Sequence, residues 1–402
     1  MRQINNRNIE ICTVLSFILI PLSGLATDVY MPSMPDMAKS FGTDASGIQK
    51  TLILFLTSYG VAQFFAGAVL DSFGRYRTGL WALAIFTATN FIIVTTSHLE
   101  IIYAMRIIQG IATAFIVVGK RAFFVDVYEG EKQKHYTGLL TIVWATAPII
   151  APFVGGFLQK KYGWASNFEL LGIYSFIMLV SELIFGGESL QQKKPFKIKE
   201  IANVYKKLLS DFQFSAGLFV LGISNSIVIV FSMAVPFIVE HRYHMSPVVT
   251  GYSGLISGVA ILVGGILGKM SKKSITVISS KAIVVQIILI AIMLVTSSND
   301  SYPLMMIFVF MIHAIVGFIF NLFFTFCLTR FPENAGVASG LTSGGNYMVT
   351  SAFSTSLLAL IYVNDQLYLA TCYFILSAIV CALLFALRYK VYTKKLLLLM
   401  HK

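Results

Sequence analysis

A few charged residues interrupt long apolar stretches of this sequence, and their types suggest proton and anion chemistry. Asp28 lies inside an apolar stretch at 9–35, and Arg106 and Lys120 lie inside another at 101–125. A carboxyl group can take up and release a proton, whereas Arg and Lys donate hydrogen bonds and attract anions. An ionised group in so apolar a setting is costly unless it is paired or hydrated. These side chains are therefore candidates for a functional site.

Each candidate also has a structural interpretation. Asp28 could cap a helix end before Pro32, but we favour a proton carrier whose protonation changes with its environment, modulated by Arg106. Lys120 lies near a helix end, where its long side chain could instead extend to the membrane surface. Glu182 lies near the end of another apolar stretch and is expected to be solvated there.

Helix geometry places several polar residues of the 101–125 stretch on one face. At about 100° per residue, Thr113 lies about 20° from Arg106, and Lys120 lies about 40° from it. Gln109 and Arg121 lie about 60° to either side of Arg106. We therefore expect Arg106, Thr113 and Lys120 to form a polar stripe, flanked by Gln109 and Arg121, and we expect all five side chains to contact a substrate.

Other polar and aromatic residues inside apolar stretches are weaker candidates for substrate binding. His313 could titrate near neutral pH, or could be a neutral, hydrogen-bonded core residue. Asn225 and Asn346 could line a cavity or join neighbouring helices. Tyr30 and Tyr59 are candidate cavity aromatics, although most aromatic residues in so apolar a chain serve packing.

The elements that carry these residues are expected to be membrane-spanning helices. Of the 402 residues, 57% are hydrophobic and only 12% are charged, a composition that excludes a soluble enzyme. A membrane crossing takes about 20 residues. The sequence predicts an all-α integral membrane protein with twelve helices, near 9–35, 50–70, 78–97, 101–125, 137–158, 167–187, 213–239, 247–268, 274–297, 302–328, 335–361 and 366–388.

The positions of the basic residues predict the topology. Most of the 30 Lys and Arg residues fall on one side of the predicted helices, as expected of cytoplasmic loops, so both termini are predicted to be cytoplasmic. The net charge of +12 is thus a topology signal, and no nucleic-acid partner is expected. We expect a six-helix bundle at 1–187, a basic cytoplasmic linker at 188–212, and a second six-helix bundle with a basic tail at 213–402.

Signals for enzymatic chemistry and cofactors are missing from the sequence. Gly119–Lys120 and Gly268–Lys269 do not complete a phosphate-binding loop, and no zinc-binding His pair or serine-nucleophile motif occurs. The four cysteines lie singly in apolar stretches and are expected to pack as small hydrophobes. We expect no enzyme activity, no metal and no cofactor, so any work must be driven by an ion gradient.

Two local motifs lead to a family. Between the second and third predicted helices the sequence contains a loop motif formed by Gly67, Asp71, Gly74, Arg75 and Arg77. This motif resembles the signature loop of the major facilitator superfamily. The fifth predicted helix contains Pro148, Pro152, Gly155 and Gly156, which resemble the antiporter motif of that superfamily. With the end of the first helix and Arg106-Ile-Ile-Gln109-Gly110, the chain resembles Bcr/CflA-type drug:proton antiporters.

The resemblance implies a fold, an activity and a location. It implies two six-helix halves that alternate access and export small compounds in exchange for protons, across the bacterial inner membrane. Small-molecule substrates, protons and the lipid bilayer are then the partners, and we expect the chain to act as a monomer.

The loop motif is expected to act as a cytoplasmic latch. Asp126 lies about 160° from Arg106 on its helix, away from the polar stripe. It is therefore suited to pair, together with Asp71, with Arg75 or Arg77.

One departure from the family pattern concerns substrate charge. Cation-exporting relatives often carry a second acid two turns before the aspartate, where this chain has Ile20. With few acids and several bases in the stripe, the field favours anionic, zwitterionic or neutral substrates. Export of an anionic siderophore is therefore the alternative to general drug export, and a passive facilitator or channel is a third interpretation.

Overall fold

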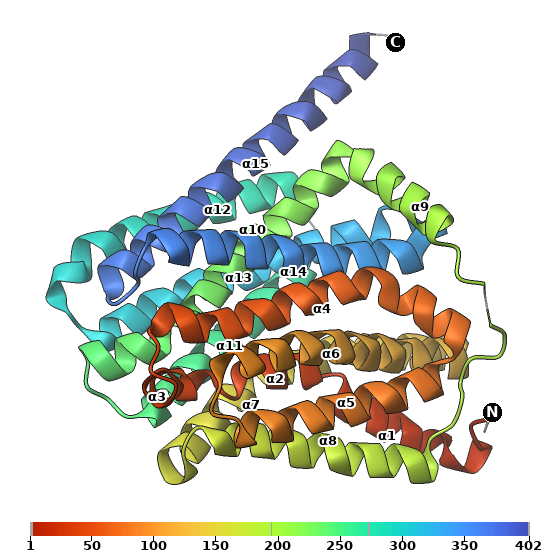
Figure 1. Cartoon of the computed structure of the whole chain (residues 1–402). Helices are drawn as coiled ribbons and strands as arrows, with labels where there is room; N and C mark the ends of the chain where they lie inside the picture. Colours follow the sequence, from red (N-terminus) through yellow and green to blue (C-terminus); the bar gives the residue numbers. More distant parts are fainter. Residues whose placement is uncertain (1–2, 194, 272–273, 401–402) are drawn as a thin grey trace. The chain divides into compact units, whose positions relative to one another are not determined.

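The computed structural model describes residues 3–193, 195–271 and 274–400, and these residues are almost entirely helical (Figure 1). The first bundle contains α1 (Ile9–Leu19), α2 (Leu22–Asp28), η2 (Met31–Ser33), α3 (Met34–Ser40), α4 (Ala45–Phe73), α5 (Arg75–Thr95), α6 (Leu99–Val127), α7 (Gly130–Tyr162) and α8 (Ala165–Phe185). It is followed by α9 (Ile198–Ser210), α10 (Phe212–Phe237), η3 (Ile238–Arg242), α11 (Pro247–Met270), α12 (Ile275–Val295), η4 (Thr296–Asn299), α13 (Tyr302–Thr329), η5 (Pro332–Asn334), α14 (Ala335–Leu360) and α15 (Gln366–Met400).

Among the described residues, ten helices are long and apolar enough to cross a membrane. They correspond to ten of the twelve predicted spans. The other two predicted spans correspond to α7 and α14, with 33 and 26 residues, which are long enough to cross but are not among the ten. The structure therefore confirms an all-helical membrane protein, while the exact number of crossings and the side of the termini stay predictions.

The first predicted span is not one helix. It is divided into α1, α2, η2 and α3, with breaks next to Pro21 and Pro32. Proline lacks the amide N–H that continues a helix and clashes with the preceding turn. Asp28 is the last residue of α2, so the candidate proton carrier lies next to a break in the helix.

The chain forms two compact units. Unit 1 comprises residues 1–202 and 235–255, and unit 2 comprises residues 203–234 and 256–402. The C-terminal end of α10 and the N-terminal part of α11 are thus grouped with the first bundle, whereas the expected division at 188–212 assigns both helices to the second bundle.

Inside unit 1, glycines let helices approach closely. A Cβ on Gly110 of α6 would lie 2.5 Å from the Phe55 carbonyl oxygen of α4. On α7, a Cβ on Gly155 would lie 1.7 Å from the Val29 carbonyl oxygen, and one on Gly156 would lie 2.7 Å from the Pro247 carbonyl oxygen. Such distances exclude any side chain, so Gly155 and Gly156 are required by backbone contact.

Candidate functional site

Asp28 occupies an unusual position at the end of α2. The residue as a whole is half-buried, although both neighbouring residues, Thr27 and Val29, are buried. Among the described residues no ion pair involves Asp28, whereas Asp36, Asp71 and Asp126 of the same unit are all hydrogen-bonded or paired. Asp28 is therefore a carboxyl group that can exchange a proton without breaking an ion pair.

Arg106 is completely enclosed in unit 1. Its guanidinium group donates hydrogen bonds to the carbonyl oxygens of Ala26 at 3.1 Å and Thr51 at 3.3 Å, and to Gln109 Oε1 at 2.8 Å. It also lies between two rings, 4.8 Å from the Tyr30 centroid and 4.4 Å from the Phe55 centroid. Its side chain is 0% exposed, so carbonyls and aromatic faces stabilise the charge in place of a carboxylate.

In this structure the central residues of the polar stripe are enclosed. Arg106 and Gln109 contact each other, and Thr113 donates to the Gln109 carbonyl oxygen at 2.7 Å, but all three residues are fully buried. They are closed to a substrate in this structure because the donors of Arg106 are directed at neighbouring backbone. Arg106 reaches Asp28 only indirectly, through the carbonyl of Ala26 two residues earlier in α2.

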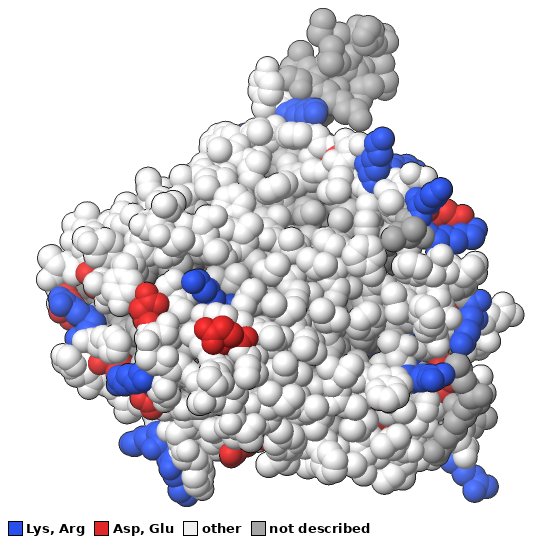
Figure 2. Space-filling model, viewed as in Figure 1, with Lys and Arg blue, Asp and Glu red and all other residues white. Residues whose placement is uncertain are grey.

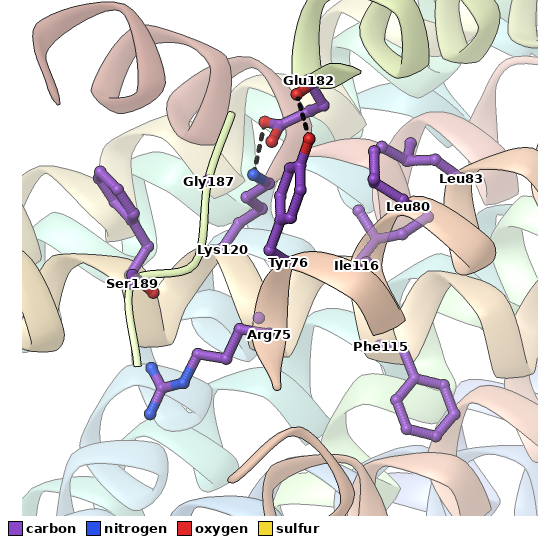
Figure 3. Close-up of a pocket in the computed structure, with 13 residues that line it drawn as sticks. Arg75, Tyr76, Leu80, Leu83, Phe115, Ile116, Lys120, Glu182, Gly187 and Ser189 are labelled. Atoms are coloured by element: carbon purple, nitrogen blue, oxygen red, sulfur yellow. Dashed lines mark hydrogen bonds and ion pairs between the residues drawn. The ribbon is translucent and has the colours of Figure 1, made fainter. Parts of the chain in front are cut away.

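Lys120 pairs with a residue of another helix and not with the other members of the polar stripe. Its Nζ lies 2.5 Å from Glu182 Oε1 of α8, and the two side chains are 18% and 5% exposed. Glu182 is therefore a buried partner of Lys120, and the expectation of a solvated end is wrong. The carbonyl oxygen of Glu182 also accepts a hydrogen bond from Tyr76 Oη at 3.1 Å, and Figure 3 shows Lys120 and Tyr76 both directed at Glu182.

These residues line a small cavity in unit 1. It has a volume of about 30 Å³, enough for one or two water molecules, and it lies between α5, α6, α8 and the segment after α8. Arg75 and Ser189 form part of its wall. The charge of Lys120 is thus neutralised within this cavity and is not available to attract an anionic substrate.

The latch residues come together as expected. Arg75 lies 3.1 Å from Asp71 Oδ1 and 2.6 Å from Asp126 Oδ2. Gly74 makes the turn between α4 and α5 with φ +101°, which a side chain would disfavour, whereas nothing lies within 4 Å of the position a Cβ on Gly67 would take. Arg77 is exposed and forms no ion pair with another described residue.

Glu188 is a further member of this cluster that was not predicted from the sequence. The carboxylate of Glu188 is buried and accepts hydrogen bonds from the backbone amides of Arg75 at 3.0 Å and Tyr76 at 3.3 Å. It therefore caps the N-terminus of α5, where a negative charge is favourable. The next residue, Ser189, donates to Asp126 Oδ2 at 2.9 Å, so the start of the linker is attached to the latch. The only sequence signal was an acid at the start of a basic linker.

The aromatic and basic candidates of unit 1 are mostly enclosed. Tyr30 and Tyr59 are at most 1% exposed, and Tyr30 Oη lies 3.0 Å from Thr51 Oγ1. Both are therefore enclosed in this structure, while Arg121 is half-buried and remains accessible.

In unit 2 the candidates separate into two groups. His313 is fully buried, with Nδ1 2.7 Å from Ser257 Oγ and Nε2 3.0 Å from Tyr373 Oη, which supports the interpretation as a hydrogen-bonded core residue. Asn225 is partly exposed and donates to Thr350 Oγ1 at 3.2 Å. Asn346 is 4% exposed, and its Oδ1 has no hydrogen-bond partner among the described residues. No group of three or more His, Cys, Asp or Glu residues that could hold a metal occurs in the described ranges.

Comparison with known proteins gives these contacts a context. Residues 16–355 match the family model of the Major Facilitator Superfamily. An uncharacterized MFS-type transporter of Bacillus subtilis is 26% identical over 80% of this chain and 81% of its own length. Multidrug resistance protein D of Escherichia coli is 30% identical over 41% of this chain and 42% of its own length. A bicyclomycin resistance protein homolog of Haemophilus influenzae is 26% identical over 58% of this chain and 62% of its own length. The relatives named for drug resistance thus match less than two thirds of their own length, and their names agree with the predicted Bcr/CflA-type resemblance.

Solved structures agree in fold. The D-xylose–proton symporter gives a TM-score of 0.70 at 14% identity and covers 92% of this chain and 96% of its own. A human organic anion transporter gives a TM-score of 0.66, also at 14% identity, and covers 96% and 100%. At this identity the similarity concerns the fold alone.

Proposed function

Because this chain belongs to the Major Facilitator Superfamily of transporters, we propose that it is a proton-coupled antiporter that exports small drug-like compounds. The resistance-protein names among its relatives support drug efflux. Export takes place across the bacterial inner membrane, with both termini in the cytoplasm, and the proton gradient supplies the energy. The chain works as a monomer without a cofactor.

The observation that carries the proposal is the environment of Asp28. Asp28 is an acidic residue, half-buried as a whole, inside a candidate membrane-spanning segment, at a helix break, and without an ion pair among the described residues. An ionisable residue at such depth is by default a functional group in a transporter. A small shift of α2 changes its hydration, and therefore its protonation, because no salt bridge has to be broken first.

Arg106 acts in this proposal as a positioning residue. It fixes the Ala26 carbonyl near the end of α2 and simultaneously holds the Thr51 carbonyl of α4. Any movement of α2 relative to α6 must break the bond to Ala26. Arg106 thus couples the position of Asp28 to the packing of the bundle without contacting the substrate.

The contacts also favour a neutral or zwitterionic drug over an anionic siderophore. The anionic alternative depended on a stripe of three bases, but Lys120 is paired with Glu182 and Arg106 is enclosed. Of these three basic residues, Arg121 is the one that remains accessible to an anion. A passive facilitator has no use for a titrating Asp28.

The proposal is tested by measuring proton release from the detergent-solubilised protein in weak buffer when candidate substrates are added. Neutral, cationic and anionic compounds are compared. We expect proton release with at least one compound class for the native chain and none for Asp28→Asn, which keeps the shape but cannot titrate. Glu100→Gln, at an exposed position at the start of α6, is the matched control and should release protons normally. Proton release by Asp28→Asn equal to that of the native chain would refute the assignment.

A further inference from the structure

The linker helix α9 is amphipathic, and its residues separate into two faces. At about 100° per residue, Lys199, Asn203 and Lys206 lie within about 60° of one another. The opposite face carries the apolar residues Ile198, Ile201, Val204, Tyr205 and Leu208. Leu208 is fully buried, and burial raises the pKa of Tyr205 to about 12, so protein covers the centre of the apolar face.

One apolar residue at the border of the two faces is not covered. Leu209 is 47% exposed, and Phe212, the first residue of α10 and of a candidate membrane span, is 39% exposed. On the helix, Lys206 lies about 60° from Leu209, whereas Lys207 lies about 160° from it. Exposed apolar side chains next to a lysine are the pattern of a segment at the boundary between hydrocarbon and headgroups.

A second lysine, on another helix, lies beside Phe212. Lys390 of α15 lies with its Nζ 4.0 Å from the centre of the Phe212 ring. Figure 2 shows Lys and Arg side chains over α9, in the upper right of the view, with acidic side chains among them. Glu200 of α9 is paired with Lys197 at 2.7 Å. Asp211, the residue between α9 and α10, is already paired with Arg330, because both of its carboxylate oxygens accept hydrogen bonds from that residue at 2.8 Å. Lys206 therefore carries a charge that no ion pair among the described residues neutralises.

Hydrogen bonds also hold the turn between α9 and α10 in place within unit 2. Asp211 accepts a hydrogen bond from the Phe214 amide at 2.8 Å, and Ser215 Oγ donates to the Leu209 carbonyl oxygen at 2.6 Å. Partial burial of Asp211 raises its pKa, but the bonds from Arg330 and Phe214 outweigh burial and leave the pKa below its ordinary value. The carboxylate thus stays ionised and paired with Arg330 at neutral pH, and these hydrogen bonds hold the backbone turn that carries Leu209 and Phe212.

We propose that Lys206 and Lys390, with Leu209 and Phe212, form a binding site for one anionic phospholipid. The lysines contact its phosphodiester headgroup, and Leu209 and Phe212 contact the start of its acyl chains. A basic residue at an anionic membrane surface strengthens binding about fivefold. This site goes beyond the transport activity and requires only that the chain lies in a membrane.

The test uses the full-length protein with Leu209→Trp, titrated in neutral detergent with phospholipids that carry bromine on their acyl chains. Bromine quenches a nearby tryptophan, and the parent protein supplies the background of its own 3 Trp residues. We expect phosphatidylglycerol to quench at a concentration many times lower than phosphatidylcholine. Leu360→Trp, 83% exposed at the far end of α14, should show no such preference.

Charge variants then identify the site. Adding Lys206→Gln and Lys390→Gln to Leu209→Trp should reduce the preference for phosphatidylglycerol by more than tenfold, whereas Lys207→Gln should leave it within about twofold, since each relevant lysine contributes about fivefold. Equal quenching by both lipids, or a preference that Lys207→Gln reduces as much as the double substitution does, would overturn the proposal. Loss of quenching on adding millimolar inorganic phosphate would show a free-phosphate site instead of a lipid site.

Discussion

At the scale of single residues, the burial of Lys120 and Glu182 changes what each charge can do. A surface lysine can be replaced at little cost, but an ion pair with side chains only 18% and 5% exposed leaves an uncompensated charge when one partner is removed. The loss of stability on removing one partner therefore tests whether Lys120 has a structural role.

We expect Lys120→Met or Glu182→Leu alone to destabilise the protein by about 3–5 kcal/mol, because each leaves one buried charge unpaired. The double substitution should recover most of the loss, since it removes both charges from the cavity. Thermal unfolding of the four proteins in one detergent gives this double-mutant cycle. If the two losses simply add, the ion pair does not contribute to the stability of the first bundle.

At the scale of elements, the latch joins α4, α5 and α6 through Arg75. Asp71 is on α4 and Asp126 is on α6, so a single guanidinium group holds three helices at the same end of the bundle. Glu188 and Ser189 attach the segment after α8 to the same cluster. If this cluster acts as the predicted latch, a change in it should alter the rate of conformational change and leave the enclosed residues around Arg106 unaffected.

Asp71→Asn should lower transport by at least tenfold while substrate affinity stays within a few-fold of the native value. The reason is that the neutral amide weakens the hold on Arg75 but lies outside the polar stripe. Transport in proteoliposomes and equilibrium binding in detergent are measured on the same preparation, with Asp44→Asn, which keeps the cap of α4, as control. A collapse of affinity with unchanged turnover would contradict the latch.

Most elements were predictable from the sequence, and the exceptions have physical causes. Long apolar stretches predict membrane helices because hydrocarbon leaves the backbone no other partner. The same signal hides the breaks at Pro21 and Pro32, since the residues around the prolines remain apolar. The helix α9 was missed because its lysines resemble a polar loop.

The site was predictable only where a charge pattern specified a partner. Arg75, Asp71 and Asp126 were paired correctly from loop position and helix angle. The partner of Lys120 lies 62 residues away on another helix, and the helix angle of Lys120 alone cannot identify it. The enclosure of Arg106 depends on backbone carbonyls, which a sequence pattern does not display.

At the scale of the whole molecule, antiport requires that proton and substrate use the same conformational change in alternation. In the proposed antiport cycle, a proton must neutralise the carboxylate of Asp28 before the substrate-free protein can change back to the conformation that binds substrate. A carboxyl group that is permanently neutral removes that requirement. Uncoupling at Asp28 should therefore abolish work against a gradient without stopping the movement itself.

Asp28→Asn in proteoliposomes should fail to accumulate substrate under an imposed pH gradient, but should still exchange internal for external labelled substrate when no gradient is present. The amide keeps the size of the carboxyl group and its position at the end of α2, so the conformational cycle with bound substrate remains possible. Arg106→Ala serves as the comparison, because it releases the Ala26 carbonyl and should reduce both accumulation and exchange. If Asp28→Asn accumulates substrate as the native chain does, the proton is carried elsewhere. If it loses exchange as completely as accumulation, Asp28 is needed for the conformational change itself and the coupling role is wrong.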